Sequence, residues 1–221
     1  MNRASRFMSI FVVTRPRQAV MVGVLLSVVL GRSLSSVDFN ASDGRCPSDW
    51  SARNAIIVTE KGRIDVGLYW DRAPRTACNF ARYVLAGHYD GGTFFRTVRK
   101  VADARNPIKI DVVQADIRRH VGKGAFGSIP LERTSETGLL HSHGTLSMAR
   151  SGIDDATSSF FICIGDQPEL DFGGRRNIDG QGFAAFGRVV RGMDVVRRIH
   201  QSAALDERLS PPIKIIRVTL N

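Results

Sequence analysis

The sequence has 221 residues, 43% of them hydrophobic, which is enough apolar material for one well-buried domain. It contains neither internal repeats nor an extended low-complexity tract, which excludes a repeat array. The formal net charge of +10 would suit nucleic acid or an anionic membrane surface, but its distribution weakens this interpretation. Five arginines lie in a leader without acidic residues, and the other basic residues are scattered among acidic ones. We therefore predict solvated basic faces and no nucleic-acid partner.

The N-terminal leader has the composition of an export signal. A basic start is followed by an apolar run, Ala19–Leu30, and then by small residues at Ser33–Ser36. About twelve apolar residues are too few to span a bilayer core of about 30 Å comfortably, but they suit the core of a signal peptide. We predict a signal peptide at residues 1–35, and the alternative is an uncleaved membrane anchor that also uses Ile10–Val13. Either one places the folded domain outside the cytoplasm, in the periplasm or secreted.

Residues 36–54 are predicted to form a linker between the leader and the folded domain, residues 55–221. The linker contains Cys46, and the other two cysteines are Cys78 and Cys163. Three cysteines allow at most one internal disulfide, and none has a neighbour at metal-ligand spacing. An oxidising compartment would permit a Cys46–Cys78 bridge, and isolated thiols are the alternative.

The folded domain begins with a predicted hairpin and a predicted helix. β-rich runs at Ala55–Thr59 and Arg63–Trp70 flank Glu60-Lys61-Gly62, a good hairpin signal. Pro74 then opens a helical pattern of apolar residues, which Gly87 ends. Further strands are predicted at Thr93–Val98, Lys109–Ala115, Thr145–Ala149, Phe160–Ile164, Phe183–Val190 and Ile213–Leu220, and a second helix at Asp194–His200. With about eight short strands and two helices, closure into a barrel is the economical way to hide the sheet edges.

The stretch Gly144–Gly165 contains the candidate site. Two short alternating apolar runs, Thr145–Ala149 and Phe160–Ile164, are joined by a polar segment, which predicts two strands and a loop. Because residues two apart in a strand share a face, Phe161 should point to one side of the sheet and Phe160 to the other. One face then fills a core, and the other presents an aromatic ring beside backbone donors, a candidate peptide-binding surface. The alternative is an ordinary hydrophobic hairpin.

Four segments carry a family resemblance. They read GTLSMA at Gly144–Ala149, SSFFI at Ser158–Ile162, LD at Leu170–Asp171 and FAAFG at Phe183–Gly187. Together they resemble signature segments of the cyclophilin-type peptidyl-prolyl isomerases, in a divergent, bacterial-like branch. The resemblance implies a mainly β fold, a closed eight-stranded antiparallel barrel capped by two α-helices. It also implies an enzyme without metal or cofactor that binds proline-containing peptide segments of client proteins. We expect the protein to be a monomer.

The reaction that the resemblance implies is cis–trans isomerisation of X–Pro bonds in folding extracytoplasmic proteins. Rotation meets a barrier of about 18–20 kcal/mol because amide resonance must be broken. In the twisted state the prolyl nitrogen regains a lone pair, so a fixed cation that donates a hydrogen bond there lowers the barrier. By family correspondence Arg96 is that donor, and Gln114 positions it. This chemistry requires no nucleophile, metal or proton shuttle.

The family correspondence also implies the substrate-binding residues. The apolar seat for the prolyl ring consists of Phe161, Leu170 and Met148, with Val112 on its rim and Ala149, Arg150 and Phe183 beside it. The backbone N–H at the Arg150 position is expected to donate to a substrate carbonyl.

Several positions depart from the family pattern. Phe183 stands in place of a histidine, Glu169 in place of a tryptophan, and Ser159 in place of a glutamine. Asp111 occupies the place of the usual pocket phenylalanine, and a carboxylate at the floor would oppose burial of an apolar ring. These departures keep a second hypothesis open, a non-catalytic proline-peptide-binding or chaperone module on the same barrel.

Two histidines are the other candidate ligands. His141 and His143 alternate on one side of an extended segment, but no third metal ligand is evident. We therefore predict solvated or hydrogen-bonded histidines and no metal site. Contact with a membrane is expected only through the N-terminal segment, if that segment stays uncleaved.

Overall fold

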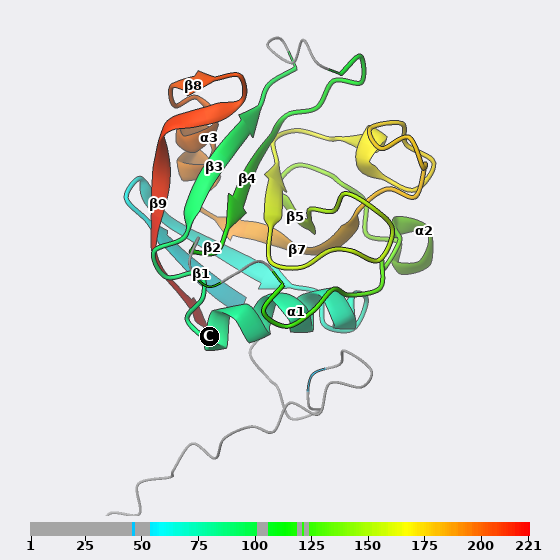
Figure 1. The fold of residues 1–221 in the computed structure, drawn as a ribbon, viewed down its shortest axis with the longest axis horizontal. Helices are drawn as coiled ribbons and strands as arrows, with labels where there is room; N and C mark the ends of the chain where they lie inside the picture. The colour runs from blue at the N-terminus through cyan, green and yellow to red at the C-terminus, as the bar shows by residue number, and fades with distance from the viewer. Residues whose placement is uncertain (1–45, 47–53, 101–105, 119–120, 122–123) are drawn as a thin grey trace, which may run out of the picture. The chain divides into compact units, whose positions relative to one another are not determined.

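The computed structural model describes residues 46, 54–100, 106–118, 121 and 124–221 (Figure 1). The chain divides into two units, Met1–Asp38 and Phe39–Asn221, and every described residue belongs to the second. The predicted leader, residues 1–35, lies outside the described residues, as does the predicted linker apart from Cys46 and Asn54. Among the helices of the described residues, none is long and apolar enough to cross a membrane.

Eight antiparallel strands form a closed barrel. In sheet order they are β1 (Asn54–Thr59), β2 (Gly62–Leu68), β7 (Ala184–Arg191), β5 (Thr145–Met148), β6 (Phe160–Cys163), β4 (Val112–Asp116), β3 (Thr93–Val98) and β9 (Arg208–Leu220). Strand β9 also pairs with β1, which closes the sheet and confirms the predicted barrel. The two-residue strand β8 (Ala204–Leu205) pairs with the start of β9. Closure removes the long unpaired edges that an open sheet would expose.

The two predicted helices cover the barrel. Helix α1 (Pro74–Leu85) begins at Pro74. Proline suits this position because the first N–H of a helix has no partner within the helix. Gly87 follows the end of the helix with a left-handed φ of 65°. It packs against β7 and β9 and lies below the barrel in Figure 1. Helix α3 (Met193–His200) packs against β2, β3 and β4 and lies at the upper left. The one-turn helix α2 (Thr134–Thr137) and a 3₁₀ turn at Pro168–Leu170 are too short to show an apolar period in the sequence.

Strand β6 separates two apolar clusters. Phe160 and Ile162 enter the main core, where the Phe160 ring meets Phe80 edge-on with 5.5 Å between centroids. Phe161 and Cys163 point the other way, into a smaller cluster. That smaller cluster also contains Val98, Ile110, Val112 and Leu170. The predicted alternation along the strand is thus confirmed, and the smaller cluster forms the floor of the candidate site.

A disulfide joins Cys46 to Cys78 in α1, with the two Cα atoms 5.3 Å apart. Of the two alternatives that the sequence leaves open, the structure contains the bridge. Cys163 is a buried free thiol, and burial raises its pKa. Because the bridged residues are 32 positions apart, loop-closure entropy predicts a stabilisation of roughly 3–4 kcal/mol.

Breaking this bridge is expected to destabilise the domain. The Cys46→Ala substitution should lower the free energy of unfolding by about 2–4 kcal/mol, because the unfolded chain regains the entropy of an open loop. Urea denaturation of the wild type with and without a thiol reductant measures the effect. Reductant should change nothing in the Cys46→Ala protein, which serves as the control. Equal stability of the wild type in both conditions would contradict the structure.

Candidate active site

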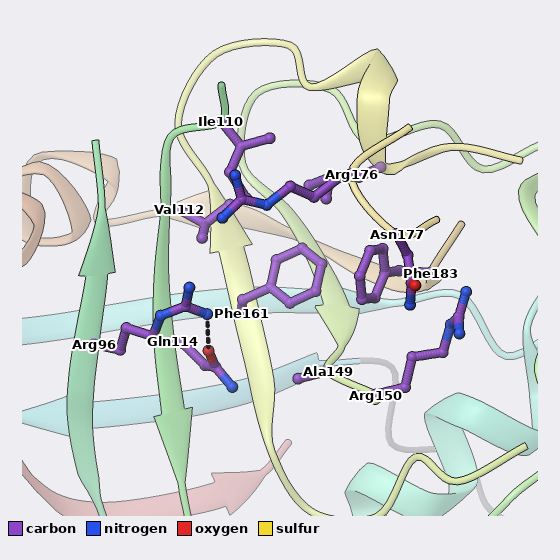
Figure 2. Close-up of a pocket in the computed structure, with 11 residues that line it drawn as sticks. Arg96, Ile110, Val112, Gln114, Ala149, Arg150, Phe161, Arg176, Asn177 and Phe183 are labelled. Carbon is purple, nitrogen blue, oxygen red and sulfur yellow. Dashed lines mark hydrogen bonds between the residues drawn. The ribbon is translucent and has the colours of Figure 1, made fainter. Parts of the chain in front are cut away.

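A pocket of about 220 Å³ lies beside strands β3, β4 and β6 (Figure 2). Its lining consists of Arg96, Ile110, Val112, Gln114, Ala149, Arg150, Phe161, Leu170, Arg176, Asn177 and Phe183. All the site residues predicted from the sequence except Met148 are among them. The floor is apolar, and the groups that can donate hydrogen bonds stand at its edges, which is the usual composition of a small ligand site.

Three neighbouring strands bring Arg96, Gln114 and Phe161 side by side. Arg96 pairs with Gln114 across β3 and β4, and Gln114 pairs with Phe161 across β4 and β6. Directly opposed residues in a sheet project from the same face. The register of the barrel therefore places a guanidinium, an amide and an aromatic ring next to one another, as Figure 2 shows.

A bulge in β3 gives Arg96 its direction. Phe94 pairs with Ala115 and Arg96 pairs with Gln114, so Phe95 is an extra residue between the two pairs. Phe94 is fully buried in the main core, and in a regular strand Arg96, two residues on, would share its face. The extra residue reverses the alternation and turns Arg96 toward the pocket.

Hydrogen bonds hold the Arg96 guanidinium from two sides. Its Nη1 donates to Gln114 Oε1 at 3.1 Å, while Nε and Nη2 donate to Glu207 Oε2 at 2.9 and 2.7 Å. Gln114 is fixed in turn, because its Nε2 donates to Ser159 Oγ at 3.0 Å and the Ser159 hydroxyl donates to the Ala115 carbonyl. The donor groups are thus oriented by the protein itself.

The pocket floor is apolar despite the acidic residue at position 111. The Asp111 carboxylate accepts the backbone N–H of Lys100 at 2.9 Å and lies 3.6 Å from His200 Nε2, away from the pocket. Ile110 and Val112, its two neighbours, line the pocket instead. The residues that line the pocket therefore include no carboxylate.

Phe183 forms the wall opposite Arg96. Its ring meets Phe161 edge-on with 5.5 Å between centroids, and the Arg150 guanidinium lies 5.2 Å from the Phe183 centroid. Arg150 donates to both carboxylate oxygens of Asp179 at 2.7 and 2.8 Å, and to the Gly182 carbonyl at 2.7 Å. These hydrogen bonds from Arg150 lower the pKa of Asp179 to about 2. Since that pKa lies below its ordinary value, the pair stabilises the fold above about pH 4 and this contribution is lost as pH falls toward 2.

A buried histidine lies behind Phe161. His141 Nδ1 is 2.7 Å from Asp171 Oδ1, and Nε2 is 2.9 Å from Ser147 Oγ. The imidazole stacks on Phe161 with 6.0 Å between centroids, so it supports the floor from below. His143 accepts a backbone N–H through Nδ1 at 2.8 Å. Both histidines are hydrogen-bonded, as predicted, and no group of three metal-ligating side chains occurs in the described part of the chain.

Comparison with known proteins decides the family. The family model described as cyclophilin type peptidyl-prolyl cis-trans isomerase/CLD matches residues 55–220. Peptidyl-prolyl cis-trans isomerase A of Dickeya dadantii is 33% identical over 152 residues, which cover 68% of this chain and 73% of the relative. A peptidyl-prolyl cis-trans isomerase of Acinetobacter baylyi is 32% identical over 175 residues, 74% of this chain and 83% of the relative. The chain belongs to the cyclophilin-type peptidyl-prolyl cis-trans isomerases.

The fold of this cyclophilin agrees with its family. A crystal structure of a cyclophilin-type isomerase from Cryptosporidium parvum has a TM-score of 0.60 to it at 17% identity, covering 76% of this chain and 97% of that one. The barrel and the family together establish the chain as a peptidyl-prolyl isomerase and confirm the resemblance seen in the sequence.

One predicted residue of the cyclophilin's seat lies elsewhere. Met148 is fully buried in the main core and does not line the pocket. Its neighbour Ala149 does line it, and because successive side chains of a strand point to opposite faces, only one of the two can face the pocket. Met148 is therefore not part of the seat.

In this cyclophilin the sequence does not predict three lining residues of the pocket, Ile110, Arg176 and Asn177, nor Glu207, which contacts Arg96 without lining the pocket. Ile110 could have been predicted from the sequence, because it precedes Val112 by two positions and therefore shares its face. Arg176 reaches across the upper edge of the pocket in Figure 2, where its Nη1 donates to the Ile108 carbonyl at 2.5 Å. Glu207 has no sequence signal, because 111 positions separate it from Arg96.

Substitutions at two adjacent positions test this floor. Ile110→Ala removes apolar surface from the seat and should weaken binding of an Ala-Pro peptide about fivefold, or ~1 kcal/mol. Asp111→Asn should leave the affinity unchanged, because that side chain faces Lys100 and His200. NMR titration gives both affinities, and circular dichroism shows whether the variants are folded. Tighter peptide binding by Asp111→Asn would indicate that the carboxylate does face the pocket.

Proposed function

We propose that this cyclophilin accelerates rotation of X–Pro bonds in proteins that fold outside the cytoplasm, and that Arg96 acts on the prolyl nitrogen. The observation that carries the proposal is a fixed guanidinium at the edge of an apolar pocket. Arg96 lies in register with Gln114 and Phe161, so one pocket offers both a seat for the ring and a donor for its nitrogen.

The mechanism follows from amide electronics. An X–Pro bond resists rotation by about 18–20 kcal/mol because the nitrogen lone pair is delocalised into the carbonyl. At the half-rotated state that delocalisation is lost and the lone pair returns to nitrogen. A hydrogen bond from Arg96 to this lone pair stabilises the twisted state and not the planar ground states, which is the condition for a faster reaction. Because Gln114 already orients the guanidinium, little reorganisation is needed during the reaction.

The rest of the pocket suits a reaction that forms no covalent bond. None of its lining side chains carries a hydroxyl, thiol, carboxylate or imidazole group. Within the described part of the chain, the backbone N–H of Arg150 has no hydrogen-bond partner, so it can donate to a substrate carbonyl. The side chain of Arg150 is occupied by Asp179, which leaves peptide contact to the backbone.

Proline-containing peptides are the substrates we propose. The Cryptosporidium parvum cyclophilin has also been crystallised in the presence of the dipeptide Ala-Pro, and that structure has a TM-score of 0.58 to this chain at 17% identity. The apolar floor formed by Ile110, Val112, Phe161 and Leu170 would receive the prolyl ring. We propose that the natural ligands are segments of client proteins and that the domain acts as a monomer.

Two features support an extracytoplasmic location. The leader combines basic, apolar and small residues in the order of an export signal. The Cys46–Cys78 disulfide is of a kind that persists in oxidising compartments. Residues 1–35 would deliver the domain to the periplasm or the exterior, as a cleaved signal peptide or as an anchor.

Arg96→Ala is expected to abolish most of the catalysis and little of the binding. Loss of one preorganised donor typically lowers enzyme rates by about 10²–10³, and we expect a fall toward that range. Arg96→Lys should restore activity only in part, because a point ammonium lacks the planar fork that Gln114 orients. Exchange spectroscopy on a short Ala-Pro-Phe-type peptide measures the rate, and titration measures the affinity.

The control for this experiment is Arg217→Ala, which removes an exposed arginine from β9. It should leave both the rate and the affinity unchanged. A folded Arg96→Ala protein that exchanges the peptide at the wild-type rate would refute the role proposed for Arg96.

The leader gives a separate prediction. If residues 1–35 are a signal peptide, the mature chain should begin between about Ser33 and Ala41. N-terminal sequencing of the protein from its native host determines this point. An intact Met1 in the membrane fraction would show an anchor instead of a cleaved signal.

A further inference from the structure

Glu207 approaches Arg96 from a tight turn between β8 and β9. Both central residues of that turn, Asp206 and Glu207, have left-handed backbones, with φ of 48° and 66°. Glycine, asparagine and aspartate adopt such a conformation most readily, so of the two residues it is less favourable for Glu207. The Glu207 carbonyl accepts the Thr97 N–H at 2.8 Å, which fixes the turn to β3 one residue beyond Arg96.

The contact between the two side chains is a directed one. A single oxygen of Glu207, Oε2, accepts from both Nε and Nη2 of Arg96, while Gln114 accepts from Nη1. Only 10% of the Glu207 side chain is exposed, against 35% of the Arg96 side chain. Hydrogen bonds between charged groups are stronger than those between neutral groups. The largely buried carboxylate of Glu207 therefore holds the guanidinium firmly.

The geometry leaves the guanidinium with donors to spare. An arginine side chain has five N–H groups in one plane. Three are used by Glu207 and Gln114, which leaves one on each Nη. The hydrogen bonds at Nε, Nη2 and Nη1 together fix the orientation of the guanidinium plane. They therefore also fix the directions of the two remaining N–H groups.

We propose that Glu207 is a positioning residue for the isomerase reaction, which holds Arg96 so that its remaining N–H groups face the prolyl nitrogen. This inference rests on the proposed role of Arg96. The carboxylate has two opposite effects on that role. It fixes the donor, which raises the rate, and it offsets the positive charge, which lowers it. Because the target is a directional lone pair on a neutral nitrogen, the orientation effect is the larger.

Three substitutions separate these effects. Glu207→Ala removes the anchor and should lower the catalysed exchange rate about tenfold, with the peptide affinity within about twofold of wild type. Glu207→Gln keeps an acceptor oxygen without the charge and should retain at least about a third of the rate. Glu207→Gly removes the anchor but suits the left-handed backbone, so a slow Gly variant cannot be attributed to a strained turn. Glu60→Ala, in the exposed turn between β1 and β2, is the carboxylate control.

A second readout does not depend on turnover. The ¹⁵N–¹H signal of Arg96 Nε should be sharp and protected in the wild type and in Glu207→Gln, and broadened in the Ala and Gly variants. Absence of catalysis by the wild type would refute the proposed function, while this signal would still report whether Glu207 holds the guanidinium. Folded Ala and Gly variants with the wild-type rate would overturn the positioning role. So would a Gln variant as slow as the Ala variant.

Discussion

The alternation of side chains along a β-strand is the constraint on which this site depends. Regular alternation in β3 would send Arg96 to the same face as Phe94, into a core of aromatic rings where a guanidinium without partners could not be buried. The extra residue Phe95 reverses the alternation. Strands β4 and β6 then supply Gln114 and Phe161 at the level of Arg96, and closure of the barrel fixes that register.

For two of the three arginines that line the pocket, the ion pairs serve geometry more than attraction. Arg96 is paired with Glu207 on one side of the pocket, and Arg150 is paired with Asp179 on the other. Each pairing fixes a guanidinium in place and offsets its charge. A pocket with these matched pairs and an apolar floor suits a ligand that is itself uncharged, as a prolyl ring and its amide are.

Period-two patterns and turn residues were enough to predict the strands and the closure into a barrel, whereas most of the pocket residues were predicted only through the family resemblance. What depends on packing was not predictable. The sequence predicts a carboxylate at the pocket floor from Asp111, but this carboxylate points toward Lys100, and Ile110 lines the pocket in its place.

Strand β9 starts at Arg208, before the predicted Ile213, although proline usually breaks strands. Pro211 and Pro212 fall between the paired positions Arg208 and Ile213, where no β3 partner needs their N–H. The Cys46–Cys78 bridge and the Glu207 contact join distant segments, so spacing alone could not reveal them.

The central claim is that a fixed donor beside an apolar seat lowers the barrier to rotation about an X–Pro bond. The most direct measurement is exchange spectroscopy on a short Ala-Pro-Phe-type peptide with a catalytic amount of the purified wild-type domain. We expect cis–trans exchange much faster than the uncatalysed rate, which has a time constant of tens to hundreds of seconds. Peptide binding seen as chemical-shift changes, without any acceleration of exchange, would contradict it and leave a non-catalytic peptide-binding module.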